Sequence, residues 1–331
     1  MPDARFVRDW DEYMVEVNAA TSIGEIFQLP TGEAAYYTGR KSGSSLQADA
    51  GVDEQIIFDT SGKVTVTKTT GIVILDGGRV YWDHSANSAT YLKVNDRDFY
   101  IGRAVGDAAS NAATLVVDLN KNPPYDIDLL RDGYLTVPVG TQVLGGFLPP
   151  QRQGGALAFI LNATSEAQKL DALSRDRFAK NANAIAEFIF LVPSDGAGTV
   201  VDVSIGIANG TNATDASAIA ERLFAHLDAN VVDILFESAD GITTVALVDS
   251  TKNYAEGSAV AQRVELWFDL RTNADIQCYV DGVLILPATV FRLDNATGPL
   301  GLLVHVEKTA STDTYELTVE RACVRYAEQA A

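Results

Sequence analysis

One stretch of the sequence combines an aromatic ring with two carboxylates at the spacing of a β-strand: Glu265-Leu266-Trp267-Phe268-Asp269. Because side chains alternate across a strand, Glu265, Trp267 and Asp269 are predicted to share one face, opposite the apolar residues. A tryptophan between two carboxylates on an exposed sheet face is typical of a sugar-binding platform. A solvated strand, or one that faces another subunit, would show the same pattern. The stretch is therefore a candidate glycan face, and the alternative is a strand that faces solvent or another subunit and binds no sugar.

The other residue types that could do chemistry are scattered along the chain. The three histidines, His84, His226 and His305, lie far apart, and no Cys/His spacing indicates a zinc site. His305 alternates with apolar strand residues, which favours a packed or surface histidine. Asp126 and Asp128 could offer oxygens to calcium, although acidic pairs in loops are usually only solvated. The sequence therefore predicts no catalytic, metal or cofactor-binding residue and no cofactor.

Motifs for covalent catalysis and nucleotide binding are also missing from the sequence. It contains no Gly-x-Ser-x-Gly elbow, and Gly62-Lys63 is followed by Val64 without the upstream glycine of a phosphate-binding loop. Cys278 and Cys323 lie in strand-like patterns and are expected to be buried thiols, since the start of the chain does not resemble a secretory signal. We therefore expect a protein that is not an enzyme.

Charge restricts the class of partner. The chain of 331 residues has a formal net charge of −19 and a pI near 4.4. Nucleic acids and anionic membranes both require clustered Lys and Arg, and the longest basic cluster is Gly39-Arg40-Lys41. No apolar run approaches the length of roughly 18–20 residues that a membrane span needs. We expect neither nucleic acid nor membrane as a partner, and an acidic surface that suits exposure to bulk solvent.

Short runs rich in Val, Ile, Thr and aromatic residues recur along the chain, separated by Gly, Asn and Asp. They predict an all-β protein with a small N-terminal β-barrel or sandwich followed by a larger β-sandwich. One helix is expected at 215–227, with Asp215 as its cap and Ile219, Leu223 and Leu227 at a spacing of four. The predicted segments are an N-terminal arm or first strand at 1–22, a β domain at 23–120, a Pro/Gly-rich connection at 121–155 and a second β domain at 156–331.

The N-terminal segment carries aromatic and basic residues together. They are Arg5, Phe6, Arg8, Trp10 and Tyr13. A first strand followed by a surface segment would explain them. An arm that lies on a partner protein is the alternative, because aromatic and arginine side chains are common interface anchors.

An ordered set of motifs runs through the first 120 residues. The set is Ala4-Arg5-Phe6-Val7, Gly24-Glu25-Ile26, Ser61-Gly62-Lys63-Val64, Gly77-Gly78-Arg79-Val80-Tyr81-Trp82-Asp83, Tyr100-Ile101-Gly102-Arg103-Ala104-Val105 and Val116-Val117-Asp118-Leu119. In this order the motifs resemble the family of phage capsid decoration and head-fibre proteins (DUF2190-like). The most specific part is the Val-Tyr-Trp-Asp strand followed by Ile-Gly-Arg-Ala.

This resemblance implies a structural virion protein, a capsid cement or decoration protein. Such a protein would bind the major capsid protein on the outer capsid surface and stabilise the shell, commonly as a homotrimer. The arm and the β domain at 23–120 would dock, with Arg5, Phe6, Arg8, Trp10 and Tyr13 as candidate capsid contacts. The second β domain would project outward.

Residues 156–331 have a weaker resemblance, carried by Glu265 to Asp269, the hairpin Tyr279-Val280-Asp281-Gly282-Val283-Leu284-Ile285 and a strand near Leu317. These features are similar to concanavalin-type lectin and laminin-G jelly-roll sandwiches. The resemblance implies a possible carbohydrate partner and an alternative function, a glycan-binding adhesin that attaches the particle to surface polysaccharide. Retaining glycosidases of this fold class use Glu-x-Asp-x-x-Glu, whereas this chain has Glu-x-Trp-x-Asp, which argues against hydrolysis.

Overall fold

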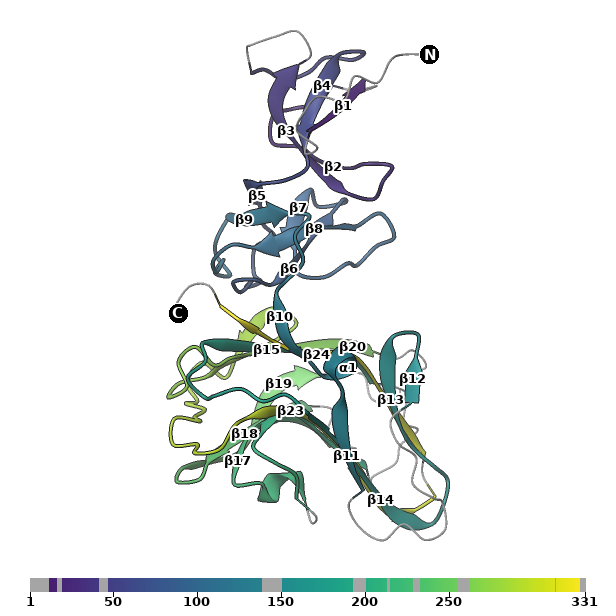
Figure 1. Cartoon of the computed structure of the whole chain (residues 1–331), viewed down its shortest axis with the longest axis vertical. Coiled ribbons are helices and arrows are strands. Elements are labelled where there is room, and N and C mark those ends of the chain that lie inside the picture. The colour runs from purple at the N-terminus through teal and green to yellow at the C-terminus, as the bar shows by residue number, and fades with distance from the viewer. Residues whose placement is uncertain are drawn as a thin grey trace. The chain divides into compact units, whose positions relative to one another are not determined.

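The computed structural model describes residues 12–16, 20–41, 47–138, 151–192, 201–212, 215–228, 233–254, 262–312 and 314–327. In these ranges almost every element is an antiparallel β-strand, which confirms the predicted all-β class. The chain divides into two compact units, Met1–Pro124 (unit 1) and Tyr125–Ala331 (unit 2), shown in Figure 1. No helix in the described ranges is long and apolar enough to cross a membrane.

Unit 1 contains two small antiparallel sheets. The β3 sheet has the order β1 (Glu12–Glu16), β4 (Gln55–Asp59), β3 (Ala34–Lys41) and β2 (Ile26–Gln28). The β8 sheet has the order β5 (Lys63–Thr67), β9 (Thr114–Leu119), β8 (Phe99–Ala104), β6 (Arg79–Asp83) and β7 (Ser88–Thr90). The larger core of unit 1 lies on the β8 sheet and includes Ile26 and Ala34 from the other sheet, so the two sheets share buried apolar area.

A single asparagine joins the two sheets of unit 1 through the backbone. Asn120 follows β9 with a left-handed φ of 55°, a conformation that asparagine tolerates better than most residues. Its Oδ1 accepts from the Ala34 N–H at 2.9 Å, and its Nδ2 donates to the Ala34 carbonyl at 2.8 Å and to the Thr60 carbonyl at 2.7 Å. The side chain thus imitates a strand partner for Ala34 where the sheets meet.

Unit 2 is a sandwich of two larger sheets. The β15 sheet has the order β12 (Gln151–Gln153), β13 (Ala156–Leu161), β24 (Tyr315–Tyr326), β15 (Ala184–Val192), β20 (Gln262–Asp269), β21 (Gln277–Val280) and β22 (Val283–Ile285), with β10 (Tyr125–Asp128) also beside β24. The β16 sheet has the order β11 (Tyr134–Pro138), β14 (Glu166–Ser174), β23 (Gly301–Ser311), β16 (Val201–Ala208), β17 (Glu221–Asp228), β18 (Asp233–Asp240) and β19 (Thr244–Asn253).

The inner faces of these sheets supply one apolar core. Alternate residues of each strand point into it, as period-2 patterning requires. Phe188 and Phe236, from opposite sheets, both pack edge-on against Phe268, with ring centroids 5.9 and 6.2 Å apart. This is the larger β-sandwich that the sequence predicts.

The predicted helix at 215–227 is wrong. Asp215 does act as a cap, since its Oδ1 accepts from the Ser217 N–H at 2.8 Å, but the turn that it caps is a 3₁₀ helix of only three residues, Ala216–Ala218. The segment then continues as β17. A spacing of four also fits one face of a strand, and Leu223 and Leu227 both point into the sandwich core.

The Pro/Gly-rich stretch at 121–155 supplies β10, β11 and β12 of unit 2, together with the short helix α1 (Leu129–Asp132). Asp128 caps this helix, because its Oδ1 accepts from the N–H groups of Leu130 and Arg131. Asp126 accepts from the Tyr326 N–H at 3.3 Å. Both carboxylates therefore serve backbone donors, and no cluster of metal-ligating side chains occurs within the described part of the chain.

Candidate functional site

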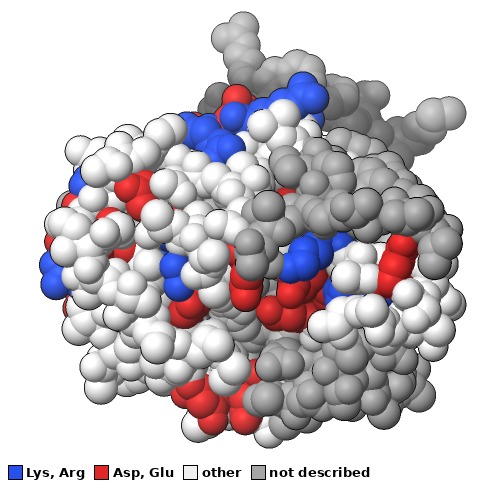
Figure 2. Space-filling view, turned by 90° about the horizontal axis from the view of Figure 1, so that it is seen from below, with Lys and Arg blue, Asp and Glu red and all other residues white. Residues whose placement is uncertain are grey.

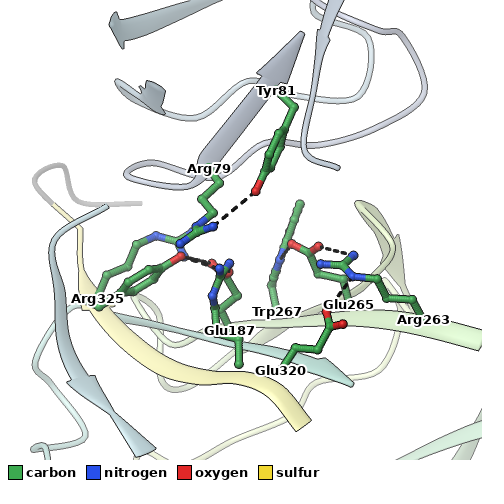
Figure 3. A network of polar contacts seen from close by, with 10 residues as sticks. Arg79, Tyr81, Glu187, Arg263, Glu265, Trp267, Glu320 and Arg325 are labelled. Atoms are coloured by element: carbon green, nitrogen blue, oxygen red, sulfur yellow. Dashed lines mark hydrogen bonds and ion pairs between the residues drawn. The ribbon is translucent and has the colours of Figure 1, made fainter. Parts of the chain in front are cut away.

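The Val-Tyr-Trp-Asp motif of unit 1 lies on β6, whose side chains point to two opposite faces. Val80 and Trp82 are buried in the core on one face, so Trp82 is a packing centre. Arg79 and Tyr81 lie on the other face, where Arg79 Nη1 donates to the Tyr81 hydroxyl at 3.3 Å (Figure 3). Tyr100 of β8 completes this cluster, edge-on to Tyr81 with ring centroids 5.6 Å apart. One motif therefore supplies both a core and an arginine–aromatic cluster.

The Ile-Gly-Arg-Ala motif on β8 needs a glycine at position 102 for a steric reason. Gly102 has a φ of 148°, and a Cβ at this position would lie 2.2 Å from the Asp118 carbonyl oxygen of β9. The register of β6 and β8 shifts at the same level, between Val80 and Tyr81. No other residue fits between these strands without moving the backbone. The glycine of the Ile-Gly-Arg-Ala sequence is thus required by the close approach of β8 to β9.

The predicted arm is not tested by the structure. Arg5, Phe6, Arg8 and Trp10 lie outside the described residues. Tyr13 belongs to β1, where its backbone is opposite Phe58 of β4. The role of these residues in capsid contact stays a prediction.

The structure contradicts the prediction that Glu265, Trp267 and Asp269 form an exposed glycan-binding face. Trp267 is only 4% exposed, and Glu265 and Asp269 are also buried. The indole N–H of Trp267 donates to Glu265 Oε1 at 2.8 Å, and its ring packs against Tyr279 with centroids 6.0 Å apart. A stacking platform needs an open aromatic face, so this strand does not provide one. The alternation of side chains was predicted correctly, but exposure of this face was not.

Trp267 instead borders a buried ionic network on the β15 sheet, drawn in Figure 3. Glu187 lies opposite Trp267 on the neighbouring strand and is 2% exposed. Its two oxygens accept from Arg321 Nη1 at 2.7 Å and Arg325 Nη1 at 2.8 Å, and the Tyr125 hydroxyl donates to it at 3.1 Å. These hydrogen bonds stabilise a carboxylate that would otherwise be costly to bury.

The carboxyl group of Glu265, which lies beside this network, has a raised pKa. Burial, reinforced by the negative charge of Glu187, raises the pKa of Glu265 to about 8. Two neighbouring carboxyl groups in such different environments are a common source of acid and base groups in enzymes. Here both groups are almost completely buried, so the arrangement supports a structural network and not a site open to substrate.

A second polar cluster crosses the outer face of the β16 sheet and was missed by the sequence analysis. Strand register aligns Asp171, His305, Ser204 and His226 in one row on four adjacent strands. Each histidine contacts two carboxylates. His305 Nδ1 is 2.5 Å from Asp171 and its Nε2 is 3.1 Å from Glu307.

His226 makes the equivalent contacts on the next pair of strands. Its Nε2 is 3.0 Å from Glu237 Oε1, and its Nδ1 is 3.1 Å from Ser204 Oγ and 3.8 Å from Asp202 Oδ1. Glu237 also accepts two hydrogen bonds from Arg222, at 2.8 and 2.9 Å. Ser204 therefore lies between the two histidine clusters.

Both histidines of this row are held in the charged form. Burial alone would lower the pKa of His226, but the carboxylates of Asp202 and Glu237 outweigh burial and raise that pKa to about 9. The pKa of His305 is raised to about 9 in the same way by Asp171 and Glu307. Burial would raise the pKa of Glu237, but His226 and Arg222 lower it to about 2.

Among the described residues of this row, the charges balance only when both histidines are protonated. Four carboxylates (Asp171, Asp202, Glu237 and Glu307) face two permanent cations, Arg222 and Lys169, the latter 2.6 Å from Glu307. Two imidazolium ions supply the missing positive charges, since 4 − 2 = 2. The row thus joins five strands by buried ion pairs, a stabilising role that fits the expectation of packed histidines.

The N-terminal part of the chain is similar to a known family. Residues 22–119 match the phage cement protein family. The matched segment runs from before β2 to the end of β9 and contains both the Val-Tyr-Trp-Asp strand and Gly102. The match confirms the predicted family resemblance and supports a phage structural protein associated with the virion. A search of the curated proteins finds no match.

Solved structures similar to this chain include carbohydrate-recognition domains. The domain of Emp47p (monoclinic crystal form 1) is 13% identical, with 61% of this chain and 94% of that chain covered and a TM-score of 0.43. The potassium-bound domain of Emp46p is 11% identical, with 59% and 89% covered and a TM-score of 0.39. Carbohydrate-binding module CBM66 from Bacillus subtilis is 8% identical, with 57% and 94% covered and a TM-score of 0.37. No ligand or activity of this chain follows from similarities at this level.

The described residues on the face in Figure 2 show no continuous charged stripe. Asp and Glu form several separate patches there, and Lys and Arg lie among them. A protein that follows a nucleic-acid backbone needs basic residues gathered along one path. The described part of this face therefore offers no such path.

Proposed function

We propose that this protein is a phage capsid cement protein that binds the outer face of the major capsid shell and stabilises it. The observation that carries the proposal is the cement-family match at 22–119, which falls within unit 1 and includes the residues that shape its core. Binding of this kind requires a complementary surface and no catalytic group. The family match thus agrees with the absence of an enzyme motif from the sequence.

We assign docking to unit 1 and to the arm that precedes it. Aromatic and arginine side chains are the usual anchors of protein interfaces, and the arm contains Arg5, Phe6, Arg8, Trp10 and Tyr13. Unit 2 would then project outward, where a strongly acidic chain keeps decorated particles apart in solution. A homotrimer at the shell surface is the expected assembly from the family resemblance.

The test is to mix the purified protein with undecorated capsids of the phage that encodes it. We expect saturable binding and a higher temperature of capsid disruption. Absence of both would overturn the proposal. The double variant Arg5→Ala/Arg8→Ala tests the arm, with Arg131→Ala/Arg175→Ala as the control that removes the same charge from exposed positions of unit 2. Only the arm variant is expected to bind more weakly.

The alternative function, a glycan-binding adhesin, was suggested by an exposed Trp267, which the structure does not show. Trp267 is buried and hydrogen-bonded to Glu265, so it has no free face for a sugar ring. Carbohydrate binding by unit 2 would need a different site. We therefore propose the capsid function alone.

A further inference from the structure

One dipeptide of unit 2 combines a side-chain amide with a backbone group that can react with it. Asn209-Gly210 is the only asparagine–glycine pair in the sequence, and it follows directly after β16. In such a pair the backbone nitrogen of the glycine can attack the amide carbon of the asparagine side chain, because glycine has no Cβ to hinder the approach. Asparagine is among the thermolabile residues of proteins. The local structure decides whether this pair can react.

The backbone leaves the β16 sheet at this dipeptide. The Asn209 N–H still donates to the Glu221 carbonyl of β17 at 3.0 Å. Among the described residues, none accepts a hydrogen bond from the Gly210 N–H, and both members of the dipeptide are partly exposed. A Cβ added at Gly210 would meet no atom within 4 Å. The attacking nitrogen is therefore outside the strand ladder, within reach of water and in open space.

The side chain of Asn209 has a buried carboxylate as its partner. Its Nδ2 donates to Oε2 of Glu221, which is 4% exposed, at 2.8 Å. The same carboxylate accepts from the Thr297 N–H at 2.6 Å, from Thr297 Oγ1 at 2.8 Å and from the Gly298 N–H at 3.1 Å. Burial would raise the pKa of Glu221, but these donors lower it. Glu221 therefore holds residues 297–298 against the start of β17, and the Asn209 amide helps to keep it charged.

We propose that Asn209 is a site of spontaneous deamidation, and that its modification weakens the contact of Glu221 with residues 297–298. The Gly210 nitrogen gives up its proton and bonds to Cγ of Asn209, the bond from Cγ to Nδ2 breaks, and Nδ2 leaves with that proton as ammonia. Water then opens the resulting succinimide to aspartate or isoaspartate. An aspartate here places a second negative charge where Glu221 now accepts a hydrogen bond, and like charges this close repel. This inference concerns unit 2 and is independent of docking to a capsid.

The experiment is to incubate the purified full chain at mildly alkaline pH and to follow the tryptic peptide 181–222 by mass spectrometry with fragment-ion assignment. We expect the amide of Asn209 to convert to the acid, and to convert faster as the pH rises, because the attacking nitrogen must lose its proton. Asn212 is the internal control, since it lies in the same peptide and is followed by alanine. The proposal is wrong if Asn209 keeps its amide, or if Asn209 and Asn212 convert at equal rates.

Gly210→Ala is the matched variant for the reaction. Gly210 does not have a left-handed φ and has space for a Cβ, so the variant should fold like the wild type. Conversion of Asn209 should become at least about tenfold slower, because the Cβ hinders the approach of the backbone nitrogen. An unchanged rate would mean that water attacks the amide directly, which would overturn the mechanism.

Asn209→Asp tests the consequence of the modification. This variant carries the product from the start, so it should unfold at a lower temperature than the wild type. Its backbone amides at Thr297 and Gly298 should exchange hydrogen faster, because both donate to Glu221. Exchange equal to that of the wild type at these two amides would show that Glu221 does not depend on Asn209, and this part of the proposal would be wrong.

Discussion

The two units bury polar side chains in different ways. In unit 1 the buried charged groups Asp98 and Lys68 bind backbone atoms: Asp98 accepts from the N–H groups of Val94 and Asn95, and Lys68 Nζ donates to the carbonyls of Thr69 and Ile72. In unit 2 buried charges pair with other charges on distant strands, as Glu187 does with Arg325. Backbone groups thus compensate these two charges of unit 1, whereas Glu187 of unit 2 is compensated by arginines on a neighbouring strand that is distant in sequence.

The largest effect should follow from removing the centre of a charge network in unit 2. Glu187→Ala leaves Arg321 and Arg325 without their carboxylate in a buried position, and we expect a loss of about 3–5 kcal/mol in the free energy of unfolding. Urea unfolding followed by tryptophan fluorescence measures it. The control is Glu320→Ala, since Glu320 pairs with Arg263 on the surface of the same sheet and should cost less than about 1 kcal/mol. Equal losses in the two variants would mean that the buried ion pairs of Glu187 stabilise the protein no more than a surface ion pair does.

The second prediction concerns pH and the histidine row. The pKa of His226 and that of His305 are raised from 6.5 to about 9, so their stabilisation is complete below pH 6.5 and is lost as pH rises through 9. Up to about 3 kcal/mol per histidine should disappear between these limits. Urea unfolding at pH 6.5 and pH 9.5 measures the loss. His305→Gln should be less stable at pH 6.5 and should lose less on going to pH 9.5, and an unchanged pH dependence would contradict the assignment.

The third prediction concerns the backbone of unit 1. Gly102→Ala places a Cβ against the Asp118 carbonyl and should cost about 2–3 kcal/mol. Gly62→Ala is the control, because Gly62 also has a positive φ, of 96°, but has no atom within 4 Å of the added Cβ. Its cost should be about 1 kcal/mol. If the two variants unfold at the same urea concentration, close approach of β8 to β9 is not what requires a glycine.

The smallest effect is expected at the residue first considered for sugar binding. Trp267→Phe keeps an aromatic ring in the same packing but removes the hydrogen bond to Glu265, which should cost about 1 kcal/mol. Thermal unfolding measures this loss. Binding to capsids should not change, since the side chain is buried. A variant that folded normally and lost binding to a particle or a glycan would show that Trp267 has a recognition role.

These differences explain what the sequence could predict. Strand propensity and turn residues predicted the all-β class, and the ordered motifs of unit 1 predicted the family that residues 22–119 match. Those motifs are contiguous runs of sequence, so they can be recognised without knowing which strands pair. The burial of Cys278 and Cys323 was also predicted correctly. A spacing of four misled the analysis at Leu223 and Leu227, since it fits a strand as well as a helix.

The polar networks of unit 2 could not be predicted in this way. The row of Asp171, His305, Ser204 and His226 exists only through the register of four strands that are distant in sequence. Exposure of Trp267 depends on the side chains that pack beside it, such as Glu265 and Tyr279. The alternation of residues along one strand predicts the face of Trp267 but not these neighbours. A charged residue on a predicted strand shows on which side of the strand its side chain lies. Its ion-pair partner depends on which strands pair and in which register, and the sequence alone does not give this.

The most direct test of the central proposal is hydrogen exchange of the full chain, free and bound to undecorated capsids. If unit 1 docks, the bound protein should gain protection in peptides from 1–124, with the arm among them. Peptides from 125–331 should exchange as in the free protein. Protection confined to the rest of unit 2, or no change anywhere, would contradict docking through unit 1.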